Sequence, residues 1–94
     1  MVVLLCRLDL YLPGARSLKE KRRRLKPLLH QMRQRFRVAA AEVGAHERWQ
    51  RAEIALVGVS TDDRSLYALM EEAVHWVEQY AAEVDVVGWQ TELR

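Results

Sequence analysis

A run of basic residues, SLKEKRRRLK at positions 17–26, is the feature of this sequence that points most directly to chemistry. It places six lysines and arginines among ten residues. Residues 16–37 carry ten basic side chains and one acid, a charge of +9, whereas the remainder carries five basic and twelve acidic side chains, a charge of −7. Such an uneven distribution is typical of a protein with a polyanionic partner, and equally of a chain that pairs with a copy of itself.

At helical spacing, most of these cations fall on one flank, while Arg24 and Arg35 fall on the other side. The flank comprises Lys19, Arg22, Arg23, Lys26, His30, Arg33 and Arg37. Its permanently charged members can neutralise several phosphates, which gives salt-dependent, sequence-independent binding of nucleic acid. We therefore take Lys19, Arg22, Arg23, Lys26, Arg33 and Arg37 as candidate nucleic-acid ligands. The alternative is a solvated face beside an acidic second helix, where exposed ion pairs contribute about 0–1 kcal/mol each.

No set of residues has the spacing of an active site or a metal centre. The three histidines share no metal-ligand spacing with one another or with Cys6. The pair Asp62-Asp63 favours a helix cap over two catalytic acids. No glycine-rich phosphate loop is present, and no serine or cysteine stands beside a plausible base. We expect no catalysis, no cofactor, no metal and no small-molecule substrate.

An aromatic residue, Trp49, stands in the polar stretch GAHERWQR at 44–51, which we interpret as a loop. Two interpretations of this tryptophan remain open. It folds back over the edge of the core, or it serves with Arg51 as an exposed anchor for a partner, the residue type favoured at binding hot spots.

The first two elements that position these residues are a strand and a helix. A strand over 2–12 places Leu4, Cys6, Leu8, Leu10 and Leu12 on one face at a period of two. The helix begins at Ser17, whose hydroxyl forms a capping box with Glu20: the carboxylate accepts from the N–H of the cap itself. Pro27 lies opposite the apolar stripe of this helix, so a bend is expected there rather than a break.

The remaining elements complete a single domain over residues 1–94. They are strands over 37–43, 52–60 and 84–93 and a helix capped by 61–63. Two strand–helix–strand units with right-handed crossovers give an α+β, ferredoxin-like βαββαβ fold, with a four-stranded antiparallel sheet and both helices on one face. RNA-recognition motifs share this fold and stack bases on aromatic residues of their first and third strands. The strand over 52–60 has no aromatic residue, so base stacking on the sheet is not expected.

Two segments, LPGARSLKEKRR at 12–23 and FRVAAAEVGAHERWQRAEIALVGVS at 36–60, resemble the YlxP-like bacterial proteins, a domain-of-unknown-function family (family 503). The resemblance covers the whole chain and is most specific over Ser17–Arg23 and Ala41–Glu53. It implies the ferredoxin-like fold and, for bacterial members, a frequent gene neighbourhood with ribosome maturation and translation initiation factors. It implies no activity and no catalytic residues.

The open face of the sheet predicts a homodimer. If Leu4, Cys6, Leu8 and Leu10 face inward, then Val3, Leu5 and Tyr11 face outward. In the last strand, one of the pairs Val84/Val86 or Val87/Trp89 must also face outward. Large apolar patches are uncommon on soluble monomers, and two-fold closure is the commonest oligomer. The predicted interface comprises Val3, Leu5, Tyr11 and Trp89.

The sequence therefore predicts a small non-enzymatic binding or assembly module that contacts RNA or the ribosome through its basic helix. The alternative is a homo-oligomeric scaffold or protein-interaction domain without nucleic-acid binding, in which the basic and acidic helices satisfy one another. A single cysteine and no recognisable secretory signal indicate a cytoplasmic protein. The N-terminal run MVVLLCRLDL is too short to span a bilayer and is broken by charges, so no membrane contact is expected.

Overall fold

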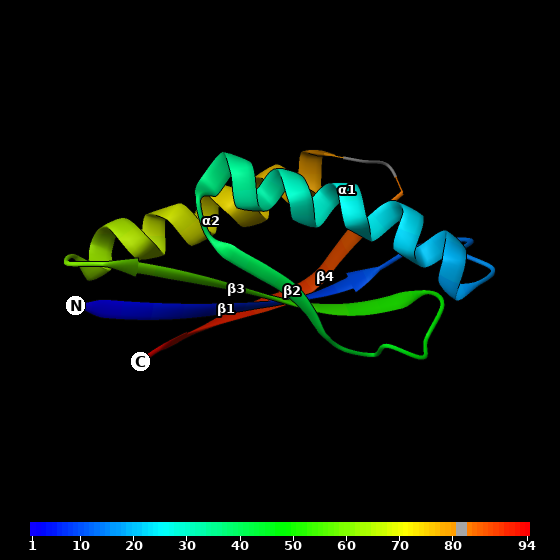
Figure 1. The fold of residues 1–94 in the computed structure, drawn as a ribbon, viewed down its shortest axis with the longest axis horizontal. Helices are drawn as coiled ribbons and strands as arrows, with labels where there is room; N and C mark the ends of the chain where they lie inside the picture. The colour runs from blue at the N-terminus through cyan, green and yellow to red at the C-terminus, as the bar shows by residue number, and fades with distance from the viewer. Residues whose placement is uncertain (81–82) are drawn as a thin grey trace.

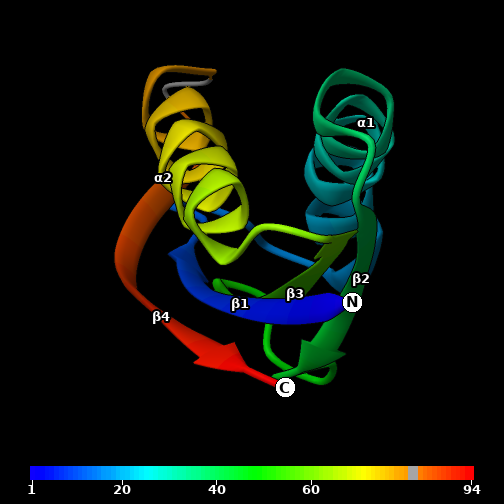
Figure 2. The same ribbon diagram turned by 90° about the vertical axis from the view of Figure 1, so that its left-hand side faces the viewer.

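The predicted ferredoxin-like fold is confirmed by the computed structural model, which describes residues 1–80 and 83–94. The elements in order are β1 (Val2–Tyr11), α1 (Leu18–Phe36), β2 (Ala39–Gly44), β3 (Arg51–Ser60), α2 (Asp63–Tyr80) and β4 (Asp85–Leu93). The strands pair antiparallel in the order β2-β3-β1-β4 (Figure 1). Both helices cover the same face of the sheet, with α1 on the β2 side and α2 on the β4 side (Figure 2).

The core lies between the helices and the inner face of β1 and β3. Leu4, Cys6, Leu8 and Leu10 are fully buried, as their period of two predicts, because β1 is a central strand paired along its length with both β3 and β4. The two helices add apolar side chains from one stripe each, among them Leu28 and Met32 of α1 and Met70 and Val77 of α2.

The N-terminus of α1 is capped as the sequence predicts, with one difference. The Ser17 hydroxyl accepts from the Glu20 N–H at 3.0 Å, which satisfies one of the free amides of the first turn. The Glu20 carboxylate accepts from the N–H of Arg16, at 3.1 Å, and not from the N–H of the cap. Pro27 is exposed within the helix, which continues past it to Phe36.

The second strand begins later than predicted. Arg37 ends α1 in the left-handed conformation, with φ 54° and ψ 43°. This conformation reverses the chain direction and cannot belong to a strand, so β2 begins at Ala39 rather than at residue 37.

Close packing of α2 on β3 depends on Gly58. A Cβ added there would lie 2.9 Å from Leu66 Cδ2 and 3.3 Å from Met70 Cε. Only a glycine lets the helix approach the strand this closely.

We predict that Gly58→Ala destabilises the fold by about 1–3 kcal/mol, because the added methyl group overpacks the contact with Leu66. The matched control is Gly88→Ala, since a Cβ there meets nothing within 4 Å. Urea denaturation of both variants measures the difference. Equal stability of the two would show that the contact between α2 and β3 tolerates a methyl group.

Candidate nucleic-acid interface

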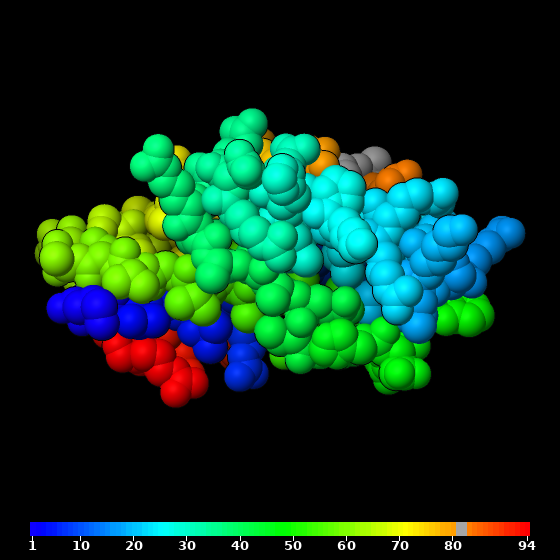
Figure 3. All heavy atoms as spheres, in the orientation of Figure 1, coloured from blue at the N-terminus to red at the C-terminus, as the bar shows by residue number. Residues whose placement is uncertain are grey.

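The basic flank forms one exposed surface of α1. Its members are Lys19, Arg22, Arg23, Lys26, His30, Arg33 and Arg37, and every one of them is exposed. In the space-filling view, α1 crosses the front of the molecule in cyan, above β2 and the loop that follows it in green (Figure 3). The flank that helical spacing predicts is therefore present, and it faces away from the core.

Two shallow hollows lie along this flank. The first, of about 560 Å³, is lined by Ser17, Lys19, Glu20, Arg22, Arg23 and Lys26. The second, of about 550 Å³, lies between α1 and β2 and is lined by Arg22, Leu25, Lys26, Leu29, His30, Arg33 and Glu42. Arg22 and Lys26 border both hollows, so these two cations lie between them in the middle of the flank.

The candidate ligands have no carboxylate partner. Within residues 1–80 and 83–94, none of Lys19, Arg22, Arg23, Lys26, Arg33 and Arg37 forms an ion pair at 4.0 Å or less. The acids that line the two hollows are already engaged, since Glu20 pairs with Arg24 and Glu42 pairs with Lys21. Ion pairs between this flank and α2, which a purely structural role would favour, are absent from the part of the chain that the structure describes.

Arg33 differs from the other members of the flank. Its Nε and one terminal nitrogen donate to the carbonyl oxygen of Ala40, at 3.0 and 2.7 Å. Because Ala40 belongs to the edge strand β2, this contact ties the C-terminal half of α1 to the sheet. Arg37 lies at the C-terminal end of the helix. The permanently charged members of the flank that lie within the helix and have no partner among the described residues are therefore Lys19, Arg22, Arg23 and Lys26.

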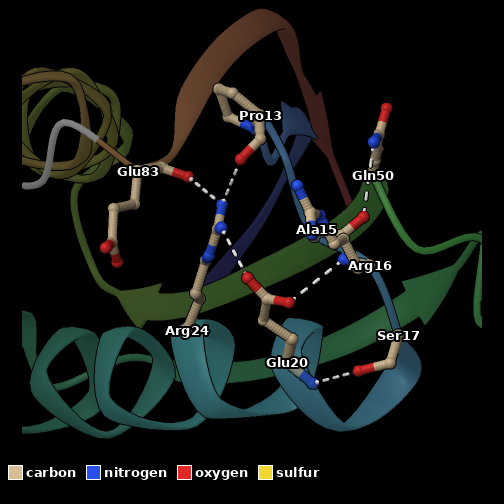
Figure 4. A network of polar contacts seen from close by, with 8 residues as sticks. All are labelled: Pro13, Ala15, Arg16, Ser17, Glu20, Arg24, Gln50 and Glu83. Carbon is tan, nitrogen blue, oxygen red and sulfur yellow. Dashed lines mark hydrogen bonds and ion pairs between the residues drawn. The ribbon is translucent and has the colours of Figure 1, made fainter.

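Arg24 lies outside the flank and has a structural role. It donates to the carbonyl oxygens of Pro13 at 2.8 Å and Glu83 at 3.1 Å, and it pairs with Glu20 at 3.1 Å (Figure 4). These contacts join α1 to the segments that precede it and that precede β4. The hydrogen bond from the Arg16 N–H lowers the pKa of Glu20, and Arg24 lowers it further, so the carboxylate stays charged for this role.

Lys21 belongs to the basic run but not to the flank, and the structure buries it. It is 1% exposed. Its Nζ donates to the carbonyl oxygen of Ala45 at 2.7 Å and lies 2.7 Å from Oε2 of Glu42, an ion pair whose angles fall outside hydrogen-bond geometry. The signal was available, because Lys21 precedes Leu25, Leu28 and Met32 at helical spacings of four, seven and eleven, on the apolar stripe itself.

Trp49 does not fold back over the core. Its side chain is 53% exposed, in the loop between β2 and β3. Arg51, with which the sequence grouped it, begins β3 and places its guanidinium 5.3 Å from the centre of the Tyr11 ring. Arg51 and Tyr11 are cross-strand neighbours on the open face of the sheet.

The open face carries three of the four predicted interface residues. Val3, Leu5 and Tyr11 alternate with core residues of β1 and therefore lie opposite the helices. Trp89 pairs with Leu8, a core residue, and so lies on the helix side at the sheet edge. The cause is a bulge in β4 opposite Asp9 and Leu10, which shifts the alternation between Val86 and Gly88.

The described residues form neither a reactive thiol nor a metal centre. Burial raises the pKa of the Cys6 thiol to about 11, so the group is a protonated packing residue at neutral pH. No three His, Cys, Asp or Glu side chains in residues 1–80 and 83–94 gather as metal ligands. Neither α1 nor α2 is long and apolar enough to cross a membrane.

Comparison with known proteins gives a family. Residues 3–91 match the model of the family described as "Protein of unknown function (DUF503)", and the chain belongs to that family. It is 40% identical over 47 residues to the "Uncharacterized protein YlxP" of Bacillus subtilis (strain 168), an alignment that covers 50% of this chain and 51% of the relative. The chain thus spans about half the length of the curated relative that it matches.

We predict that Lys21→Met destabilises the fold by about 2–4 kcal/mol, because it leaves the Glu42 carboxylate without its counter-charge in a mostly buried position. The double variant Lys21→Met/Glu42→Gln recovers part of the loss, since no charge remains there. Lys26→Met, on the exposed flank, is the control and stays within about 0.5 kcal/mol of wild type. Urea denaturation at pH 7 measures all three. If Lys21→Met proved as stable as Lys26→Met, the ion pair would not hold α1 to the hairpin.

Proposed function

We propose that this member of the DUF503 family is a non-enzymatic module that binds the phosphate backbone of RNA through the flank of α1. One observation carries the proposal: Lys19, Arg22, Arg23 and Lys26 are exposed, border one hollow, and have no carboxylate partner among the described residues. Four unpaired cations on two helical turns repel one another. A polyanion relieves that repulsion and releases its own condensed counterions, which is the main source of affinity in such complexes.

Ribosome association, in the cytoplasm, is the setting that we propose for this binding. The family resemblance implies a gene neighbourhood with ribosome maturation and translation initiation factors, where structured RNA is abundant. Backbone contacts from a single helix favour shape and charge over sequence. The absence of aromatic residues from β3 supports binding by the helix rather than by base stacking on the sheet.

We expect binding of a short fluorescent RNA duplex to weaken steeply with salt. For about four neutralised phosphates, log K falls with log salt at a slope of about −3 to −4. The triple variant Arg22→Glu/Arg23→Glu/Lys26→Glu abolishes the binding measured by fluorescence anisotropy.

A charge-matched control is available in Arg35→Glu/Arg64→Glu/Arg94→Glu, which changes the net charge equally but leaves the flank intact. This control retains most of the affinity because its three positions lie outside the flank. An equal loss of affinity in both triple variants would show that binding depends on the net charge of the protein and not on the flank. The absence of RNA binding by wild type at low salt would refute the proposal.

A second copy of the chain is the partner that we propose for the open face of the sheet. Val3 and Leu5 pair across the strands with Val59 and Val57, and Val59 is 60% exposed. These four side chains form an apolar area on the half of the face that holds the N-terminus of β1. A two-fold contact there leaves both α1 flanks on the outside, so dimerisation and RNA binding are compatible.

We expect an assembly of twice the 11.0 kDa chain mass in sedimentation velocity at micromolar concentration. Val59→Lys converts it to a monomer, because a charge at this exposed position opposes burial in the contact without touching the core. Leu5→Glu has the same effect. A wild-type monomer contradicts the dimer, and a dimer that survives both changes has its contact elsewhere.

A further inference from the structure

We propose that the hollow between α1 and β2 binds one unpaired guanosine of the RNA, with its phosphates on the cations and its base against Glu42. This inference rests on the proposed function and adds to it the identity of one base. It is carried by an observation that backbone binding does not use: the hollow has an apolar floor and a carboxylate in addition to its cations.

The hollow brings together the kinds of group that a nucleotide requires. Its lining consists of Arg22, Leu25, Lys26, Leu29, His30, Arg33 and Glu42. Leu25 and Leu29 lie one helical turn apart and are 3% and 8% exposed, so they form an apolar floor that the flat face of a base can cover. The volume of about 550 Å³ falls within the range of roughly 300–1,000 Å³ that is typical of ligand sites. Figure 2 shows α1 standing over β2 at this edge of the sheet.

Arg33 is a fixed anion-binding group at one end of the hollow. Its Nε and one terminal nitrogen donate to the carbonyl oxygen of Ala40, at 3.0 and 2.7 Å. A guanidinium has five N–H donors, so three of them remain for phosphate oxygens. Arg22 lies eleven residues earlier, about 16 Å away along the helix axis. The phosphates on both sides of one nucleotide fit between these two arginines.

Glu42 presents one carboxylate oxygen to the hollow from β2. Its Oε2 is buried and lies 2.7 Å from Nζ of Lys21. Because the side chain is 22% exposed, its exposed part belongs to the other atoms, of which Oε1 is the only polar one. None of the hydrogen bonds within the described residues ends on this carboxylate. Lys21 therefore holds a hydrogen-bond acceptor in place before any ligand arrives, which lowers the entropic cost of using it.

Guanine is the base whose edge fits such an acceptor best. Its N1–H and its 2-amino group are adjacent donors, and both can reach one carboxylate oxygen. Adenine and cytosine place an acceptor nitrogen beside their amino group, and uracil flanks its N3–H with two carbonyl oxygens, all of which the carboxylate repels. Within a duplex this edge of guanine is paired, so only an unpaired guanosine can offer it to the protein.

The test measures the affinity of wild type for four short 5′-labelled strands by fluorescence anisotropy at one salt concentration. Each strand is oligouridine with a single central guanosine, inosine, adenosine or uridine, so length and charge are equal and no guanine quadruplex forms. We expect the guanosine strand to bind about tenfold more tightly than the uridine strand. The inosine strand, which lacks the 2-amino group, falls between them.

The double variant Lys21→Met/Glu42→Met removes the acceptor without leaving a buried charge, since two apolar side chains of similar volume replace the ion pair. We expect it to lose the preference for guanosine and to keep the salt-dependent binding of all four strands. Glu53→Gln, which removes a carboxylate from the open face of the sheet, is the control and keeps the full preference. Thermal unfolding shows whether each variant is folded, and the four strands test the proposal on wild type in any case.

Free GMP distinguishes the two sources of a guanosine nucleotide. A guanosine within RNA gains affinity from neighbouring phosphates on the flank, so GMP displaces the guanosine strand only at concentrations far above the Kd of that strand. Displacement by GMP at concentrations near that Kd overturns RNA as the source of the nucleotide.

The outcomes separate this proposal from the proposed function. Equal binding of the guanosine, inosine and uridine strands by wild type overturns the base site and leaves backbone binding by α1 in place. A preference that persists in Lys21→Met/Glu42→Met, or that Glu53→Gln loses as well, also overturns the base site. Binding of no strand overturns both proposals. Loss of the preference in the double variant alone supports the base site.

Discussion

The burial of the Lys21 ammonium between α1 and the β2–β3 hairpin constrains the rest of the candidate site. Removing an ammonium group from water costs several kcal/mol, and here the Glu42 carboxylate and the Ala45 carbonyl oxygen compensate that cost. Any arrangement that moved the hairpin away from the helix would leave a charge unpaired inside the protein. The contact therefore determines where the loop after β2 lies relative to α1.

The same helix uses its positive charges in two ways. Lys21, Arg24 and Arg33 donate to backbone carbonyl oxygens of other segments, so their charges hold the fold together. Lys19, Arg22, Arg23 and Lys26 have no such partners among the described residues. The first group fixes both halves of the helix to other parts of the fold, so the cations of the second group are held in a rigid row. An anion that binds the folded state lowers the repulsion between these cations.

The two proposed binding surfaces lie on opposite sides of the molecule. The flank of α1 belongs to the helical layer, while the apolar area of Val3, Leu5, Val57 and Val59 lies on the uncovered side of the sheet. Polar residues occupy the other half of that face, where Arg7 approaches Glu53 at 3.9 Å and Arg51 covers Tyr11. One face is thus divided into an apolar and a polar half, which limits a partner copy to a defined orientation. A dimer formed this way carries two basic flanks pointing outward.

The fold, the inner face of β1, the Ser17 cap and the basic flank were predictable from the sequence, because each follows from a local period or a short motif that holds whatever the chain packs against. Tertiary contacts decided the rest. The burial of Lys21 was not predicted, because only the approach of the hairpin supplies the carboxylate and the carbonyl oxygen that allow it. The assignment of Trp89 to the open face was wrong, because it assumed an uninterrupted alternation of side chains along the last strand. Pairing between β4 and β1 introduces a one-residue bulge that reverses this alternation. The position of the β2–β3 loop likewise depends on the contacts of Gln50 with Ala15 and Leu12, more than thirty residues earlier in the chain, and no local pattern encodes a contact between such distant segments.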